Sequence, residues 1–199
     1  MQKTGIYGGS FDPVHNAHIK TAEVFKQKLG LDKVLIMPSN ISPHKIGFKS
    51  ADAIHRYNMC RLAFECKDGF KVSRLEIDCD TVSYTCDTLK RISKMCDDEL
   101  YLLCGADMFL TLQCWKNPDI IFSLANIVTV PRDDNDFEKL TEHKKLLERL
   151  GANIFIIDTP KIDISSTMIR KRISDGVSIS DMVPKGVEEY ILNNKLYRG

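Results

Sequence analysis

The sequence predicts an α/β protein with a doubly wound, mostly parallel sheet and helices on both of its faces. Apolar runs alternate with amphipathic stretches along all 199 residues, an alternation typical of parallel strands joined by right-handed helical crossovers. The runs 34–37 (VLIM) and 154–157 (IFII) are apolar at every position, as expected of strands that helices cover on both sides. The first apolar run leads directly into Gly8 and Gly9. Because such sheets bind ligands beyond the carboxyl ends of their strands, this turn marks a candidate site.

The apolar runs define the expected strands. They are Lys3–Gly8, Lys33–Pro38, Lys71–Leu75, Leu100–Gly105, Asn126–Pro131 and Asn153–Asp158. Ligand sites in doubly wound sheets lie near the point where the strand order reverses. The segments that follow Gly8, Pro38, Gly105 and Pro131 are therefore the candidates for binding.

The amphipathic stretches define the expected helices. They are Ala17–Leu29, Ala51–Cys66, Thr85–Met95, Pro118–Ser123, Asp136–Leu150, Thr167–Ser174 and Pro184–Asn193. Residues 39–50 are rich in turn formers and are expected to form a long loop. The length predicts a single domain, residues 1–199, in which residues 160–199 form a small helical C-terminal part.

Composition and charge exclude several classes of protein. The formal net charge is +1, which argues against broad electrostatic capture of nucleic acid. No apolar run approaches the roughly 20 residues of a membrane span, and the N-terminus lacks a signal-peptide layout. The seven cysteines are odd in number and irregularly spaced, with no Cys-x-x-Cys pair, so no zinc site is expected. We expect a cytoplasmic protein with reduced thiols.

The segment 8–18 reads GGSFDPVHNAH and suits a site that handles phosphate groups. Gly8 and Gly9 let a ligand approach the backbone closely because they carry no side chain, and N–H groups in the turn can face an anion. His15 and His18 lie about one helical turn apart, so both imidazoles can point at one spot. Read alone, the two histidines are also compatible with an ordinary helix start. Neither a Gly-x-Gly-x-x-Gly fingerprint nor a P-loop is present.

The segment 164–170, ISSTMIR, supplies a second candidate for phosphate binding. Hydroxyl residues at the start of a helix are common caps. The same N–H groups and hydroxyls can bind phosphate oxygens, and Arg170 adds positive charge about one turn into the helix. Asp12, in the turn of the first segment, is expected to have a structural role.

Weaker signals lie in the middle of the chain. They are the segments Pro43-His44-Lys45, Ser83-Tyr84-Thr85, Gly105-Ala106-Asp107-Met108 and Trp115-Lys116. Lys45 is either solvated or able to reach over a triphosphate. Trp115 either packs in the core or offers a flat platform to a heteroaromatic ring. Thr85 can help to hold a carboxylate on that ring, and Asp107 can accept a hydrogen bond from a ribose or a base.

In this order, the segments resemble bacterial nicotinate-nucleotide adenylyltransferases, members of the nucleotidylyltransferase superfamily, over essentially the whole chain. The segments 8–15 and 164–170 are specific to the superfamily, and the middle segments point to the nicotinate branch. The chain departs from the family at Ala17, where glycine is usual; alanine adds only a methyl group and favours helix. It also carries Lys116 after Trp115, where many relatives have an aromatic residue.

The resemblance implies a Rossmann-like nucleotidylyltransferase fold and transfer of the adenylyl group of ATP to nicotinate mononucleotide, giving deamido-NAD and pyrophosphate. The residues that it implies in catalysis are His18, His15 and Arg170. Those implied in ATP binding are Gly8, Gly9, Ser10, Phe11, His15, His18, Lys45, Gly105, Asp107, Ser166, Thr167 and Arg170. Those implied in binding the nicotinate nucleotide are Ser10, His44, Thr85, Trp115 and Lys116. Mg²⁺ is expected to arrive with ATP, without a protein metal site.

The residues leave the acceptor and the exact activity open. The acceptor could instead be nicotinamide mononucleotide or phosphopantetheine, although the pantetheine branch typically has threonine at the position of His15. A cytidylyltransferase and a non-catalytic nucleotide sensor also stay open. An aminoacyl-tRNA synthetase is disfavoured because the chain is too short for its tRNA-binding parts.

Overall fold

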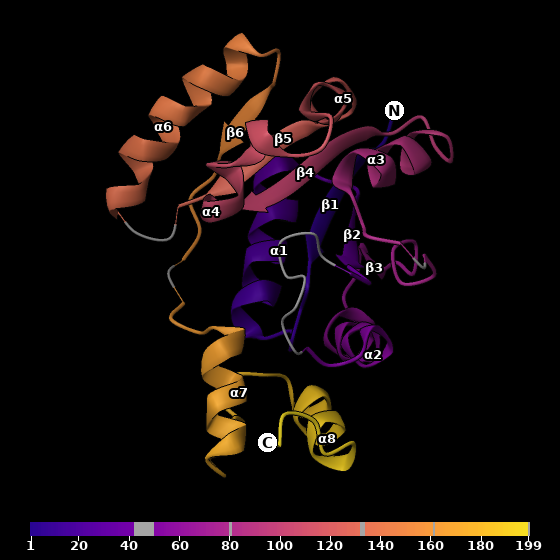
Figure 1. The fold of residues 1–199 in the computed structure, drawn as a ribbon, viewed down its shortest axis with the longest axis vertical. Helices are drawn as coiled ribbons and strands as arrows, with labels where there is room; N and C mark the ends of the chain where they lie inside the picture. Colours follow the sequence, from indigo (N-terminus) through magenta and orange to yellow (C-terminus); the bar gives the residue numbers. More distant parts are fainter. Residues whose placement is uncertain (42–49, 80, 132–133, 161, 199) are drawn as a thin grey trace.

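The computed structural model describes residues 1–41, 50–79, 81–131, 134–160 and 162–198, and within them six strands form one sheet (Figure 1). The strands are β1 (Lys3–Gly9), β2 (Lys33–Pro38), β3 (Phe70–Val72), β4 (Glu99–Gly105), β5 (Asn126–Val130) and β6 (Ile154–Ile156). Their order is β3-β2-β1-β4-β5-β6, and every neighbouring pair is parallel. This is the strand order of a doubly wound dinucleotide-type fold. The predicted fold class is confirmed.

Helices cover both faces of the sheet (Figure 1). They are α1 (Asn16–Leu29), α2 (Ala53–Phe64), α3 (Thr85–Ser93), α4 (Ala106–Phe109), α5 (Pro118–Leu124), α6 (Asp134–Arg149), α7 (Ser166–Ser174) and α8 (Lys185–Asn193), with a short 3₁₀ helix at Leu112–Cys114. Residues of α1, α2, α7 and α8 join one buried cluster, and residues of α3 to α6 join the other. Successive residues of β4 alternate between the two clusters: Tyr101 and Leu103 belong to the first, and Leu102 and Cys104 to the second. This alternation follows from the period of two along a strand.

Helix α1 lies close against β1. Gly5 makes this possible, because a Cβ at that position would stand 2.7 Å from a ring carbon of Phe25. Phe25 and Ala22 are fully buried between helix and sheet. At its far end the helix stops at Gly30, which has the left-handed conformation (φ 59°) that favours glycine. The packing therefore holds the start of α1 directly after the turn that leaves β1.

The two edge strands are shorter than predicted. β3 spans Phe70–Val72 instead of Lys71–Leu75, and β6 spans Ile154–Ile156 instead of Asn153–Asp158. At the end of β3 the backbone N–H of Leu75 donates to Oγ of Ser73 rather than to a neighbouring strand. An edge strand has a ladder partner on one side only, so its end is decided by such local contacts.

Several helix ends also differ from prediction. Helix α2 begins at Ala53 rather than Ala51, because the N–H of Ala51 donates to the Asp12 carboxylate, 39 residues away. The sequence did not predict the short α4 or the 3₁₀ helix; each is about one turn long, and such short elements carry too little periodicity to detect.

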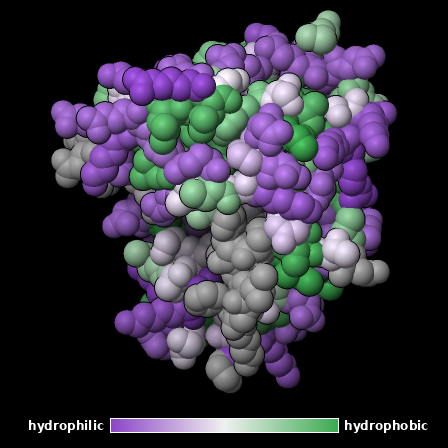
Figure 2. Space-filling view, turned by 45° about the horizontal axis from the view of Figure 1, so that its top comes forward, coloured by the Kyte–Doolittle hydropathy of each residue, from purple (hydrophilic) through white to green (hydrophobic). Residues whose placement is uncertain are grey.

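The surface drawn in Figure 2 is mostly hydrophilic, with hydrophobic side chains in separate patches. Within the described ranges, no helix has both the length and the apolar character needed to cross a membrane. The predicted single domain stays a prediction. It is supported by Val187 and Ile191 of α8, which are fully buried in the cluster that also contains α1 and α2 residues.

Candidate active site

The candidate site lies where the strand order reverses. β1 pairs with β2 on one side and with β4 on the other, so the carboxyl ends of β1 and β4 are neighbours at the switch point of the sheet. Gly8 and Gly9 end β1, and Gly105 ends β4. Asp107 follows in the first turn of α4. Two segments singled out from the sequence are thus brought to one edge of the sheet.

The turn after β1 is tightly held. Phe11 has a left-handed backbone (φ 48°), and the peptide between Asp12 and Pro13 is cis. The Phe11 ring is only 3% exposed and meets Tyr7 and His18 edge-on, with centroids 5.4 and 5.1 Å away. Because the ring is buried under the turn, Phe11 presents its backbone rather than its side chain toward the site.

His15 and His18 lie face to face at the start of α1. Their ring centroids are 3.6 Å apart and their planes differ by 25°. His15 is the N-cap residue of α1 and only 5% exposed, whereas His18 is half-buried. Burial lowers the pKa of His15 to about 4. His15 is therefore a neutral imidazole near neutral pH, and it can offer an N–H to a phosphate oxygen without carrying a charge of its own.

The buried Nδ1 of His15 has no hydrogen-bond partner within the described part of the chain. A buried polar atom without a partner is costly and is common where a ligand completes the hydrogen bonding. This favours a ligand-binding role for His15 over that of an ordinary helix-start histidine.

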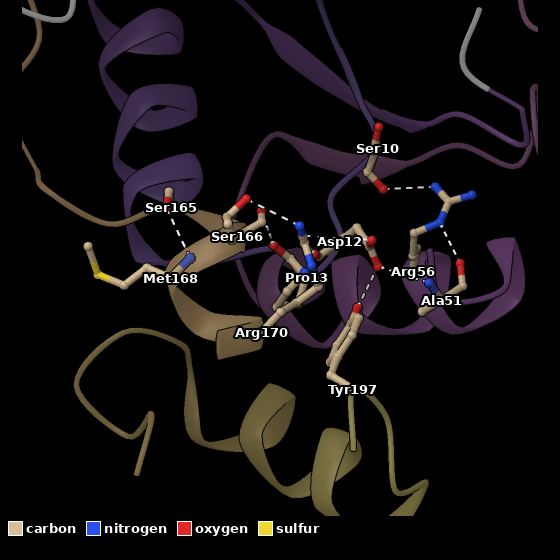
Figure 3. Close-up of polar contacts among 11 residues, drawn as sticks. Ser10, Asp12, Pro13, Ala51, Arg56, Ser165, Ser166, Met168, Arg170 and Tyr197 are labelled. Atoms are coloured by element: carbon tan, nitrogen blue, oxygen red, sulfur yellow. Dashed lines mark hydrogen bonds and ion pairs between the residues drawn. The ribbon is translucent and has the colours of Figure 1, made fainter. Parts of the chain in front are cut away.

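Helix α7 lies against the same turn, although more than 150 residues separate the two in sequence (Figure 3). Oγ of Ser165 accepts the N–H of Met168 at 3.2 Å and so caps the helix. Oγ of Ser166 donates to the carbonyl of Pro13 at 3.0 Å. The Ser166 hydroxyl was expected to face a phosphate, but its proton is used in the contact with the turn. Ser166 is also the first residue of α7, where the backbone N–H has no partner within the helix and is suited to an anion.

Arg170 also reaches the turn. Its Nη1 donates to the carbonyl of Asp12 at 2.7 Å, and its Nη2 donates to Oγ1 of Thr167 at 3.2 Å. A guanidinium carries five N–H groups, and these contacts use two of them. The side chain is 33% exposed, so we expect its remaining donors to serve an anionic ligand.

The Asp12 carboxylate is buried under the turn and joins parts of the chain that are far apart. Its Oδ1 accepts the N–H of Ala51 at 3.1 Å and the hydroxyl of Tyr197 at 2.7 Å. Its Oδ2 lies 3.8 Å from Nη1 of Arg170. Figure 3 shows these groups converging on Asp12 from α7, from the start of α2 and from the C-terminal segment. The expected structural role of Asp12 fits these contacts.

Arg56 also connects segments that are far apart in the chain, and the sequence did not predict this role. It is 3% exposed and donates to three carbonyls: that of Ala51 at 3.0 Å, that of Ser10 at 2.8 Å and that of Asn40 at 2.9 Å. Burial lowers the pKa of its guanidinium, against the opposing effect of Asp12 and other groups. Arginine on an amphipathic helix is usually exposed, so no sequence signal marked Arg56 as buried.

The predicted residues His44 and Lys45 lie outside the described residues. The chain on either side of them is described, and both flanks are held by Arg56, through Asn40 and Ala51.

Residues predicted to bind the nicotinate nucleotide lie at and near the start of α3. Thr85 is the first residue of this helix. Nζ of Lys116 lies 2.9 Å from the Asp87 carboxylate and 4.2 Å from the centroid of the Tyr84 ring. The Lys116 side chain is thus engaged by protein groups. Trp115 is half-buried and packs against the second core cluster, which fits both of its predicted roles.

Comparison with known proteins shows the family of the chain. The family model described as cytidylyltransferase-like matches residues 6–172. The "probable nicotinate-nucleotide adenylyltransferase" of Clostridium botulinum (strain Eklund 17B / Type B) is 38% identical over 100% of this chain and 99% of its own. The protein of the same name from Thermoanaerobacter sp. (strain X514) is 37% identical over 98% of this chain and 94% of its own. The chain belongs to the cytidylyltransferase-like family and, within it, to the nicotinate-nucleotide adenylyltransferases.

Solved structures show the same fold. The Plasmodium falciparum nicotinic acid mononucleotide adenylyltransferase, complexed with NaAD, matches with a TM-score of 0.80 at 19% identity, over 99% of this chain and 98% of its own. The same protein complexed with APC matches with a TM-score of 0.74. The family model and the relatives at 37 to 38% identity confirm the predicted family resemblance, and the chain is a nucleotidyltransferase.

Proposed function

We propose that this chain transfers the adenylyl group of ATP to nicotinate mononucleotide, giving deamido-NAD and pyrophosphate. The observation that carries the proposal is the joining of two phosphate-binding segments at the switch point: the stacked His15 and His18 after β1, and Arg170 with the start of α7. Membership of the nicotinate-nucleotide adenylyltransferases supplies the identity of the acceptor.

In this reaction the 5′-phosphate of nicotinate mononucleotide attacks the α-phosphorus of ATP in line, and pyrophosphate leaves. No protein nucleophile is required, so catalysis consists of positioning and of stabilising negative charge. His18 and His15 donate hydrogen bonds to the triphosphate. Arg170 and the N–H groups of Ser166 and Thr167 hold its β- and γ-phosphates.

The remaining proposed contacts divide between the two substrates. Gly8, Gly9 and the backbone of Ser10 and Phe11 border the nucleotides, while Gly105 and Asp107 line the adenosine region. Thr85 and Trp115 face the nicotinate ring. Because the Lys116 ammonium is paired with Asp87, its backbone N–H is the group that we assign to the ring pocket. We also assign His44 to the nicotinate nucleotide and Lys45 to the triphosphate.

Nucleotidyltransferases of this kind generally need a divalent metal together with ATP. We propose Mg²⁺, held mainly by phosphate oxygens and water. The Asp12 carboxylate already accepts from Ala51 and Tyr197, so we assign the cation to the phosphate oxygens. Among the described residues, no group of three or more His, Cys, Asp or Glu side chains that could hold a metal ion is found. When bound, the cation supplies neutralisation of phosphate charge. A cytoplasmic location stays our prediction, in keeping with seven free cysteines.

The test is pyrophosphate release with ATP and Mg²⁺, comparing nicotinate mononucleotide, nicotinamide mononucleotide and phosphopantetheine as acceptors. We expect a strong preference for nicotinate mononucleotide. Activity with another acceptor only would retain the adenylyl-transfer chemistry and overturn the assignment of the ring pocket. ATP binding without turnover on any acceptor would favour a nucleotide sensor.

A further inference from the structure

The last described segment of the chain reaches back to the turn after β1. The hydroxyl of Tyr197 donates to Oδ1 of Asp12 at 2.7 Å, across 185 residues of sequence. Figure 3 shows the ring rising from the C-terminal segment toward Asp12, beside Arg170. Burial and the neighbouring Asp12 carboxylate raise the pKa of Tyr197. The hydroxyl therefore keeps its proton and remains a donor.

The backbone around Tyr197 has an unusual conformation. After α8, both Lys195 (φ 52°) and Tyr197 (φ 62°) are left-handed, a region that residues with a Cβ seldom adopt. Between them, the N–H of Leu196 donates to the carbonyl of Ile191 at 3.0 Å, so the chain turns back on the end of α8. Strained backbone persists only where the surrounding contacts stabilise it, and it is common near functional sites. Here, the reversal brings the Tyr197 ring to Asp12.

Asp12 connects Tyr197 to Arg170. The Asp12 carbonyl accepts from Nη1 of Arg170 at 2.7 Å, and its Oδ2 lies 3.8 Å from the same nitrogen. Because Tyr197 and Ala51 both donate to the other oxygen, Oδ1, they set the orientation of the carboxylate that Arg170 faces. Tyr197 and Arg170 thus both contact Asp12.

We propose that Tyr197 is a positioning residue for adenylyl transfer, which acts through Asp12 to hold Arg170 in place for the pyrophosphate end of ATP. The identity of the ligand at Arg170 rests on the proposed function. The C-terminal segment then contributes to the site through Asp12, without itself touching the ligand.

The chain offers a matched pair of variants. Tyr197→Phe keeps the ring and removes only the hydroxyl that faces Asp12. Tyr190→Phe removes a hydroxyl of the same region that instead lies 3.0 Å from Nδ1 of His55 and 2.9 Å from Nδ2 of Asn58, and so joins α8 to α2. We expect Tyr197→Phe to lower kcat/KM for ATP about tenfold, since small misplacements of binding groups are costly. Its KM for nicotinate mononucleotide should change less than about twofold. Tyr190→Phe should lower the melting temperature and leave both KM values near those of the wild type.

Two results would overturn the proposal. One is an unchanged kcat/KM for ATP in folded Tyr197→Phe. The other is an equal rise in KM for both substrates, together with the same fall in melting temperature as in Tyr190→Phe. That result would show a purely structural role.

A double-mutant cycle tests the route through Arg170. In an Arg170→Ala background, Tyr197→Phe should lower kcat/KM for ATP by less than about twofold, because the residue through which Tyr197 acts is already missing. Full additivity of the two losses would overturn the route. A calorimetric titration with ATP and Mg²⁺ tests the inference separately from the proposed function. If the wild type forms no deamido-NAD, the proposed function fails. A weaker ATP affinity of Tyr197→Phe than of Tyr190→Phe still supports the role of Tyr197, and equal affinities refute it.

Discussion

The stacked histidines at the start of α1 have different surroundings. His15 is 5% exposed and has a pKa lowered to about 4 by burial, whereas His18 is half-buried and lies edge-on to the Phe11 ring. Two imidazoles at 3.6 Å cannot both be charged without strong repulsion. Because His18 is the more exposed of the two, we expect it to be the histidine that meets developing negative charge.

His15 makes stability depend on pH. Burial lowers its pKa from the ordinary 6.5 to about 4 in the folded protein. The unfolded chain therefore binds more protons between those two values, and stability falls as the pH falls through them. Between about pH 7 and about pH 5 this corresponds to a loss of about 2 kcal/mol. Urea unfolding of wild type and His15→Gln at both pH values measures the effect. The variant should lose about 2 kcal/mol less than the wild type, and equal losses would contradict a buried neutral His15.

His18 carries the larger catalytic prediction. Replacing it with alanine should lower turnover on the order of 10²-fold or more, because a donor aimed at developing charge is lost, while the protein stays folded. Steady-state pyrophosphate release measures the change. His143→Ala is the control, since His143 instead lies 3.0 Å from Oε1 of Gln113, and its turnover should stay near that of the wild type. Near-normal turnover of His18→Ala would refute the proposed mechanism.

At the scale of elements, helix α7 combines structural and binding roles. Ser165 caps it through the N–H of Met168, while the hydroxyl of Ser166 ties it to the turn after β1. We expect the remaining first-turn N–H groups of the helix to bind an anion. The same local sequence thus determines both the start of the helix and its direction toward the site.

The cap of α7 has a measurable energy. Ser165→Ala should lower the free energy of unfolding by about 1 kcal/mol, because an N-terminal N–H loses its acceptor. Ser174→Ala at the other end of the helix, where the hydroxyl donates to the carbonyl of Lys171 at 2.8 Å on the exposed surface, should change it by less than about 0.5 kcal/mol. Denaturant titrations compare the two. A larger loss in Ser174→Ala would show that the cap is not the stabilising contact.

Elements with strong periodicity were predicted well. The central strands β1, β2 and β4 and helix α1 agree with prediction to within one residue at each end, because their apolar positions are dense and their boundaries are local. The end of β3 and the start of α2 were predicted less well. There, backbone N–H groups donate to the Ser73 hydroxyl and to the Asp12 carboxylate instead of continuing the regular structure. Such competing acceptors cannot be recognised from periodicity.

At the scale of the whole molecule, the strand order places the site. With β1 and β4 adjacent, segments near residues 10 and 105 meet although about half the chain separates them. Arg56 then fastens the turn at Ser10 to both Asn40 and Ala51. A buried guanidinium with three carbonyl acceptors is well satisfied, and it ties parts of three segments into one site.

The sequence by itself determined the α/β class, the main elements and the family, and it marked the two segments that we propose to bind phosphate, since each depends on residues that are close together in the chain. Only the tertiary structure decided that Asp12 is shared by Ala51, Arg170 and Tyr197, and that the hydroxyl of Ser166 is used by Pro13. Hydrophobic periodicity and turn chemistry are local properties. A hydrogen bond between residues 39 to 185 positions apart depends instead on how strand order and helix packing bring the backbone together.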